Sequence, residues 1–180
     1  MCKNIINELL QNGLGYLTAI CARPGDGRMS LAISLANELA QRGETVYFYS
    51  FPQPTVSSIE RLSHKVQILM TPPSFTTDIQ PNAIVIIDNL SAATRTMPPC
   101  QNHDTKNSPL QHFKKMSVEK NLQLIVTDTF RRADDSDDKL PLSNAAVALC
   151  DHVYVLFKKA YWSTDPEDPY AGIPMLRQIK

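Results

Sequence analysis

The sequence of 180 residues has no excess charge of either sign, because 18 Lys and Arg balance 18 Asp and Glu. A protein held to nucleic acid or to a membrane by bulk charge is therefore not expected, although a local patch is not excluded. Long apolar runs are missing as well, since stretches such as 83–87 are far too short to span a bilayer. No apolar signal-peptide core follows the N-terminus, so a cytoplasmic protein is expected.

Clustered metal ligands are also lacking. The four cysteines are scattered, with no Cys-x-x-Cys pair and no His nearby at ligand spacing, which argues against a zinc site. Cys21 and Cys150 lie in apolar runs and are predicted to be small core residues. Glycine is scarce, with 6 residues against 13 prolines, and the prolines gather in segments that are expected to be loops.

Apolar runs and helical periodicity alternate along the chain, which predicts an α/β fold. Its mostly parallel, twisted sheet is expected to be covered by helices on both faces. Residues 1–180 are expected to form one domain, with a helical lead-in over 1–13 and a mobile loop over 91–107. Strands are predicted over 16–21, 45–49, 83–87, 122–126 and 152–157, with an edge strand over 173–179; helices are predicted over 4–10, 31–40, 56–65 and 109–120.

The turn between the first strand and the next helix has the place and length of a phosphate-binding loop. In the pattern G-x-x-x-x-G-K-[ST], Gly27 fills the second glycine position and Ala22 stands at the first. The alternative is a plain strand-to-helix turn whose glycines allow close packing. The candidate nucleotide-binding residues are Arg23, Pro24, Gly25, Asp26, Gly27, Arg28, Met29 and Ser30.

Two residues of this turn depart from the chemistry that such a loop needs. Arg28 stands where a lysine should reach the β and γ phosphates, and a planar guanidinium does not replace a compact ammonium in a tight cradle. Met29 stands where a hydroxyl should ligate magnesium, and a thioether is a poor ligand for that cation. Ser30 cannot easily substitute, because the next helical residue points about 100° around the axis.

The segment Ala22-Arg23-Pro24, with the apolar strand before it, resembles the entry to the RecA-like domain of DnaB-type replicative helicases. Ile86-Ile87-Asp88 resembles the Walker B strand of that family. Segments 46–50, 124–127 and 151–157 resemble its other strands, so that the resemblance covers most of the chain in the right order. It implies a RecA-like P-loop fold that assembles in rings, binds ATP with magnesium between subunits and moves along single-stranded DNA.

Several residues on which the family's chemistry depends are replaced here. The family's glutamate after the second strand, which activates water, falls in 50–54, where no carboxylate occurs. Asp128 stands at the family's sensor glutamine, and its charge would repel a γ-phosphate. An apolar segment, 145–150, replaces an Arg- and Glu-containing one. Arg177 and Lys180 are interpreted as remnants of the family's cationic finger.

The catalytic candidates are therefore Asp88 and Asp128, and Asp88 is the candidate magnesium residue. Asp88 is the one catalytic position that matches the family, and its alternative role is to end a strand and fix a turn. Asp104 beside His103 is interpreted as solvated. Affinity for single-stranded DNA is expected to be weak, because the loop that contacts DNA in the family carries four aspartates over 134–138.

The sequence thus predicts a degenerate P-loop domain that hydrolyses ATP weakly or not at all. It would act as a binding or assembly module, with itself or a helicase-like protein as partner and a link to DNA replication. ATP would be held weakly, if at all. One alternative is an active, divergent DNA-dependent ATPase or helicase. Another is a subunit that lends a cationic finger to a catalytically complete neighbour.

Overall fold

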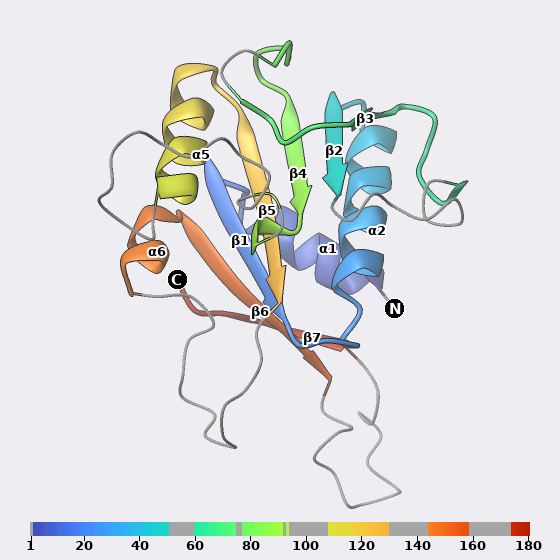
Figure 1. Ribbon diagram of the computed structural model, residues 1–180. Coiled ribbons are helices and arrows are strands. Elements are labelled where there is room, and N and C mark those ends of the chain that lie inside the picture. The colour runs from blue at the N-terminus through green and yellow to red at the C-terminus, as the bar shows by residue number, and fades with distance from the viewer. Residues whose placement is uncertain are drawn as a thin grey trace, which may run out of the picture.

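The computed structural model describes residues 2–50, 60–74, 77–91, 93, 108–129, 144–158 and 174–180. Its strands are β1 (Leu17–Ala22), β2 (Val46–Ser50), β3 (Val66–Leu69), β4 (Ile84–Asp88), β5 (Gln123–Thr129), β6 (His152–Lys158) and β7 (Pro174–Gln178). They form one seven-stranded sheet in the order β3-β2-β4-β5-β1-β6-β7 (Figure 1). The first six strands are parallel to their neighbours, and β7 pairs antiparallel with β6 at one edge.

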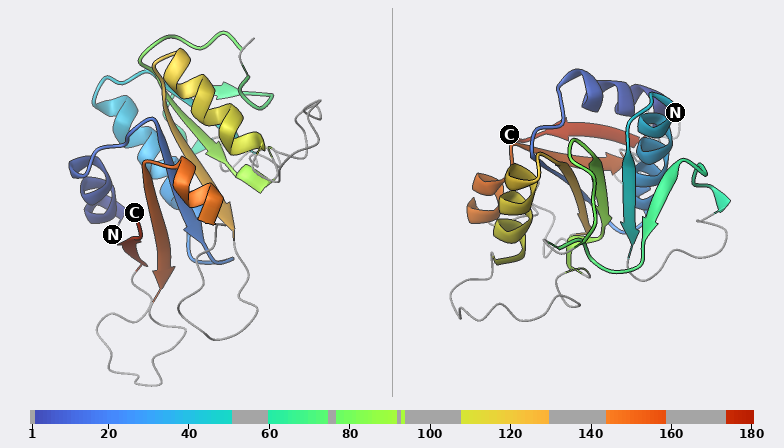
Figure 2. Two further views of the ribbon diagram at one scale, coloured as in Figure 1. Left: turned by 90° about the vertical axis from the view of Figure 1, so that its left-hand side faces the viewer. Right: turned by 90° about the horizontal axis from the view of Figure 1, so that it is seen from above.

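Helices cover both faces of this sheet. The helices are α1 (Cys2–Gln11), α2 (Arg28–Gln41), α5 (Ser108–Glu119) and α6 (Asn144–Leu149). Figure 2 shows α1 and α2 on one side of the sheet and α5 and α6 on the other. Each pair packs on its own hydrophobic cluster. The predicted α/β fold, with a mostly parallel sheet between helices, is confirmed.

Side chains alternate between the two faces along each strand, as the pleat requires. In β4, Ile84 and Ile86 belong to the cluster under α2, whereas Val85 and Ile87 belong to the cluster under α5. The same alternation places the last residue of the strand, Asp88, on the α2 side. This position matters because α2 begins at the same edge of the sheet.

Helix α2 packs closely on the sheet because its buried face alternates large and small side chains. Leu31, Leu35 and Leu39 are at most 3% exposed, and Ala32 and Ala36 beside them are equally buried. A fully buried leucine contributes roughly 1.5–3 kcal/mol, so the face stabilises the contact substantially. The period-3.6 pattern in the sequence correctly predicted this helix.

The predicted helix over 56–65 is wrong at its C-terminal end, and β3 was not predicted. Residues 61–65 form turns, in which the Val66 amide donates to the Ser63 carbonyl at 2.9 Å. Asn37 of α2 holds this turn, because its amide group donates to the Arg61 carbonyl and accepts from the Ser63 amide. The chain is then free to pair as an edge strand with β2. Residues 51–59 lie outside the described part.

Other predicted elements are confirmed within three residues at each end, and one is refined. The helical lead-in is α1, and the edge strand over 173–179 is β7. The predicted loop over 91–107 begins too early, because Leu90, Ser91 and Ala93 belong to a helical turn and Ala93 is fully buried. Most of the remaining loop, up to Asn107, lies outside the described residues.

Both Cys21 and Cys150 are buried, and burial raises their thiol pKa values to about 12 and about 11.

Asp151 joins three elements at the amino edge of the sheet. Its Oδ2 accepts a hydrogen bond from the Leu17 amide at 2.8 Å, and its Oδ1 lies 2.6 Å from the Lys114 ammonium of α5. Gly15 packs against it with φ +53°, and a Cβ on Gly15 would lie 2.7 Å from the Asp151 Cβ. The start of β1 therefore depends on a glycine at position 15.

We expect Gly15→Ala to destabilise the fold by more than Gly13→Ala does. Both residues have left-handed φ angles, but a Cβ at Gly13 would meet nothing within 4 Å. The left-handed strain of roughly 1–2 kcal/mol is common to both variants, and only the first adds the contact with Asp151. Urea unfolding of the two variants measures the difference, and equal losses would contradict the packing argument.

We expect the stabilising effect of Asp151 to disappear in acid. Burial tends to raise the pKa of this carboxyl, but the hydrogen bonds from Lys114 and the Leu17 amide outweigh it and hold the pKa below its usual range. A lowered folded-state pKa gives stability that is present above the unfolded value of about 3.9 and is lost as the pH falls through the folded value. The stability difference between the wild type and Asp151→Asn, measured by thermal unfolding, should be largest near neutral pH and shrink below about pH 4. A difference that is independent of pH would contradict this role.

Candidate functional site

The loop between β1 and α2 lies at the carboxyl edge of the parallel sheet, where ligands bind in open α/β folds. Strand β1 ends at Ala22 and α2 begins at Arg28. Gly25 and Gly27 have φ angles of +89° and +95°, which a residue with a side chain adopts only with strain. The Asp26 amide donates to the Arg23 carbonyl at 3.2 Å, which closes the loop on itself.

The backbone around Gly27 has features of an anion cradle. A Cβ added at Gly27 would meet nothing within 4 Å, so the space in front of this residue is open. Gly27 is also the N-cap of α2 and has no side chain to cap the first amides of the helix. The partial positive charge of a helix N-terminus therefore faces an open loop.

The predicted residues of this loop are differently exposed. Pro24 and Gly25 are exposed, whereas Asp26 is buried although it carries a carboxyl group. Arg23 is half-buried, as is Ser30 in the first turn of α2. The loop therefore offers its backbone at the surface while one acidic side chain lies beneath it.

Arg28 and Asp88 form an ion pair across the edge of the sheet. Arg28 Nη1 lies 3.3 Å from Asp88 Oδ1, and the two side chains are 17% and 1% exposed. Asp88 ends β4 and Arg28 begins α2, so the pair joins residues that are 60 positions apart in the sequence. The guanidinium is therefore directed at the carboxylate, where a P-loop lysine would be directed at phosphates.

Thr127 is the third member of this cluster. It lies beside Asp88 in the register of β4 and β5, and its hydroxyl donates a hydrogen bond to Asp88 Oδ1, the same oxygen that Arg28 contacts. The Thr127 side chain is buried. One oxygen of a buried carboxylate thus has both a cation and a hydroxyl donor.

The charge of Asp88 is not fully compensated by these neighbours. Burial raises the pKa of the Asp88 carboxyl above its usual range, and the carboxylate of Asp128 adds to that rise. The Arg28 guanidinium and the Thr127 hydrogen bond act in the opposite direction without reversing it.

Met29 supplies no oxygen donor for magnesium, because its side chain ends in a thioether. Its side chain is partly buried and packs against the hydrophobic cluster under α2. Asp128 lies one residue beyond Thr127 and points to the opposite face of β5 by the alternation of the strand. There Asp128 accepts a hydrogen bond from the Ser91 hydroxyl at 2.7 Å and another from the Thr129 amide at 2.8 Å.

The residues of this edge do not fit a magnesium site. Mg²⁺ requires oxygen ligands at 2.0–2.1 Å in near-octahedral geometry. Met29 supplies a thioether, and Asp88 Oδ1 is already in contact with Arg28 and Thr127. Among the described residues, no group of three or more His, Cys, Asp and Glu side chains gathers in a way that could hold a metal ion. The open backbone at Gly27, in contrast, fits a phosphate-like anion.

Of the two residues interpreted as remnants of a cationic finger, one has a structural role. The Lys180 ammonium donates to the carbonyls of Val147 and Ala148 at the end of α6, at 3.2 and 3.1 Å. Arg177 is exposed on β7. The missing-glutamate segment after Ser50, the pair His103 and Asp104, and the acidic run 134–138 lie outside the described residues.

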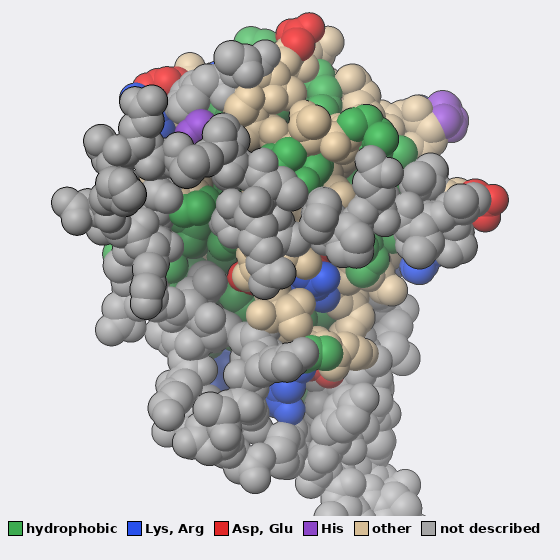
Figure 3. Space-filling view, viewed as in Figure 1, with side chains coloured by type: hydrophobic (Ala, Val, Ile, Leu, Met, Phe, Trp, Pro, Cys, Tyr) green, Lys and Arg blue, Asp and Glu red, His purple; other side chains and the backbone are tan. Residues whose placement is uncertain are grey.

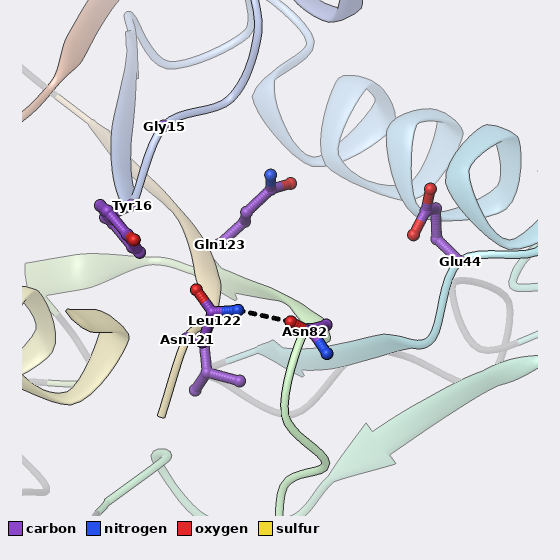
Figure 4. Close-up of a pocket in the computed structure, with 7 residues that line it drawn as sticks. All are labelled: Gly15, Tyr16, Glu44, Asn82, Asn121, Leu122 and Gln123. Atoms are coloured by element: carbon purple, nitrogen blue, oxygen red, sulfur yellow. Dashed lines mark hydrogen bonds between the residues drawn. The ribbon is translucent and has the colours of Figure 1, made fainter. Parts of the chain in front are cut away.

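A second hollow lies at the opposite, amino edge of the sheet and contains none of the predicted site residues. It is a pocket of about 310 Å³, in which the side chain of Asn121 donates a hydrogen bond to that of Asn82 (Figure 4). The pocket is lined by Gly15, Tyr16, Glu44, Asn82, Asn121, Leu122 and Gln123.

In the view of Figure 3, charged side chains are scattered over the described surface and form no continuous basic patch. No described helix is long and apolar enough to cross a membrane.

Comparison with known proteins finds similarity in structure alone. No family model matches the chain, and no curated protein sequence matches it. A solved ATPase domain of a DnaB-like helicase superposes with a TM-score of 0.64 at 15% identity, over 90% of this chain and 79% of that one. A DnaB-like replicative helicase, solved to show its interactions with primase, gives 0.61 at 14% identity, over 90% of this chain and 55% of that one. The RadB recombinase gives 0.54 at 16% identity, over 84% and 79%.

These similarities define the fold as that of the RecA-like P-loop proteins. Within that class, the resemblance to the ATPase domains of DnaB-like helicases is confirmed at the level of structure. At such low identities the similarity establishes the fold and leaves the chemistry to be argued from the residues of the loop.

Sequence reasoning missed the role of Thr127 and the pairing of Arg28 with Asp88. A signal for Thr127 was present, because it directly follows the apolar run 122–126, as Asp88 follows 83–87. If the two strands are neighbours in a parallel sheet, these polar residues meet at the same edge. The order of the strands was the missing information.

We expect Thr127→Val to be more destabilising than Thr18→Val. Both threonines are buried in strands and both donate a hydrogen bond, Thr127 to the Asp88 carboxylate and Thr18 to the Leu14 carbonyl. A hydrogen bond to a charged group contributes about 1.5–3 kcal/mol and a neutral one about 0.5–1.5 kcal/mol. Chemical denaturation of the matched pair measures this order, and a reversed order would show that Thr127 does not stabilise the carboxylate.

Proposed function

We propose that this chain is a RecA-like domain that does not hydrolyse ATP and that works as a binding or assembly module. The observation that carries the proposal is the ion pair between Arg28 and Asp88. The Arg28 cation at the start of α2 and the carboxylate at the end of β4 are paired at 3.3 Å. Neither group is then available for the phosphate or metal chemistry that hydrolysis requires.

Two further features of the chain support the loss of hydrolysis. Met29 is packed against the core instead of supplying a hydroxyl to a metal. Residues 50–54 contain no carboxylate that could serve as a general base. The backbone of the loop stays open at Gly27, so weak binding of ATP through its phosphates is retained in this proposal.

The partner in this proposal is a second copy of the chain or a helicase-like protein. The support is the structural similarity to a helicase ATPase domain and to a helicase that interacts with primase. The module would consist of residues 1–180 as one domain and would act in the cytoplasm in connection with DNA replication. An active DNA-dependent ATPase is the second candidate, which the same similarity favours.

We expect no phosphate release from the wild-type chain with ATP and magnesium, with or without single-stranded DNA. Arg28→Ala and Asp88→Ala should give the same background, because there is no turnover to lose. The double variant Arg28→Lys/Met29→Thr restores the last two positions of the loop pattern, and it should bind ATP with magnesium at least about tenfold more tightly, about 1.4 kcal/mol. Arg42→Lys, at the far end of the same helix, is the matched control and should change nothing.

Two measurements decide between the candidates. A phosphate-release assay that shows turnover in the wild type, abolished by Asp88→Ala, would overturn the proposal in favour of the ATPase. Sedimentation of the chain alone and mixed with a DnaB-type helicase tests the assembly role. A chain that stays monomeric and binds no helicase would contradict that role.

A further inference from the structure

The strand order brings the Arg28 cation to the carboxylate of Asp88. Arg28 begins the helix that follows β1, and Asp88 ends β4; β5 lies between β1 and β4 in the sheet, and its Thr127 is the register partner of Asp88. All three lie at the carboxyl edge and on the α2 side of the sheet. In P-loop proteins a magnesium ion stands between the loop and the acidic residue at this place.

Neither oxygen of Asp88 is open to a hydrated metal ion. Oδ1 is in contact with the Arg28 guanidinium and accepts from the Thr127 hydroxyl. Oδ2 is buried and has no hydrogen-bond partner within the described part of the chain. Mg²⁺ gives up its water shell reluctantly, so a carboxylate that is 1% exposed and already paired with a cation offers it no entry.

Arginine is suited to replace the ion permanently. A guanidinium stays charged at every physiological pH and is more weakly hydrated than an ammonium, so its charge can be kept in a half-buried place. Removing it would leave Asp88 as an uncompensated buried charge, which is among the more costly changes in a protein interior. Arg28 itself is 17% exposed and can turn toward water if Asp88 is removed.

We infer that Arg28 is a built-in counter-ion that replaces a divalent metal at Asp88, so that the site is closed to Mg²⁺ and Mn²⁺. These residues do not fit a magnesium site because the arginine cation takes the place of the metal cation. The inference deepens the proposed function and rests on it, because a chain that hydrolysed ATP would need the metal that Arg28 displaces.

The test uses Mn²⁺ as the probe and unfolding as a second readout, without nucleotide. We expect the wild type to show no Mn²⁺ binding by electron paramagnetic resonance beyond that of Asp88→Asn. Arg28→Ala should gain one Mn²⁺ site, and its melting temperature should rise when Mn²⁺ is added. Both effects should be lost in Arg28→Ala/Asp88→Asn. Arg42→Ala, which removes an exposed arginine paired with Glu38 in the same helix, is the control and should gain no site.

The melting temperatures of the variants should follow a defined order. Arg28→Ala should lower the melting temperature by several degrees, Asp88→Asn by less, and the double variant should recover most of the loss of Arg28→Ala. If Arg28→Ala does not fold, Arg28→Gln takes its place, and folding of the double variant is then itself evidence of the coupling.

Three outcomes would overturn the inference. One is Mn²⁺ binding by the wild type that Asp88→Asn abolishes. Another is additive destabilisation by the two single variants, and the third is a folded Arg28 variant that gains no Mn²⁺ site. Phosphate release from ATP would instead overturn the proposed function, so the two failures are distinguishable.

Discussion

A carboxylate that has almost no contact with water is the constraint on which this site depends. Asp88 lies at the end of a fully buried strand, and an ionised group there requires a cation and hydrogen-bond donors close by. Arg28 supplies the charge and Thr127 supplies a hydroxyl. Because both act on one oxygen, the positions of α2, β4 and β5 are tied together at the edge where a ligand would bind.

The rest of the sheet holds these three elements in place. Two hydrophobic clusters sandwich the strands, and the cluster under α2 fixes the direction in which the first residue of that helix points. At the opposite edge, Asp151 connects β1, β6 and α5 through Leu17 and Lys114. The loop after β1 therefore lies between two elements that are held in place: β1, which is fixed at its start by Asp151, and α2, which packs on its hydrophobic cluster.

Similarity of fold and difference of chemistry coexist in this chain. The sheet superposes on ATPase domains of DnaB-like helicases and on a recombinase, with TM-scores from 0.54 to 0.64. The residues at the loop differ from the P-loop pattern at the lysine and at the magnesium hydroxyl. Since function resides in sites and not in folds, the site directs the proposal toward binding and away from turnover.

The local pattern of the sequence by itself determined most of the helices and strands. A buried face gives a hydrophobic period of 2 in a strand and of 3.6 in a helix, and glycine and proline mark the turns. The pattern failed to predict β3. This edge strand has four residues, and only one of them is buried, so no hydrophobic alternation is visible. Comparison with the phosphate-binding-loop pattern identified Gly27, Arg28 and Met29 as notable residues, and the resemblance to a Walker B strand identified Asp88. Only the tertiary structure decided that Arg28 meets Asp88, because the two are separated by 60 residues. Their contact follows from the placing of β5 between β4 and β1, and strand order is a property of the whole sheet that no local segment encodes.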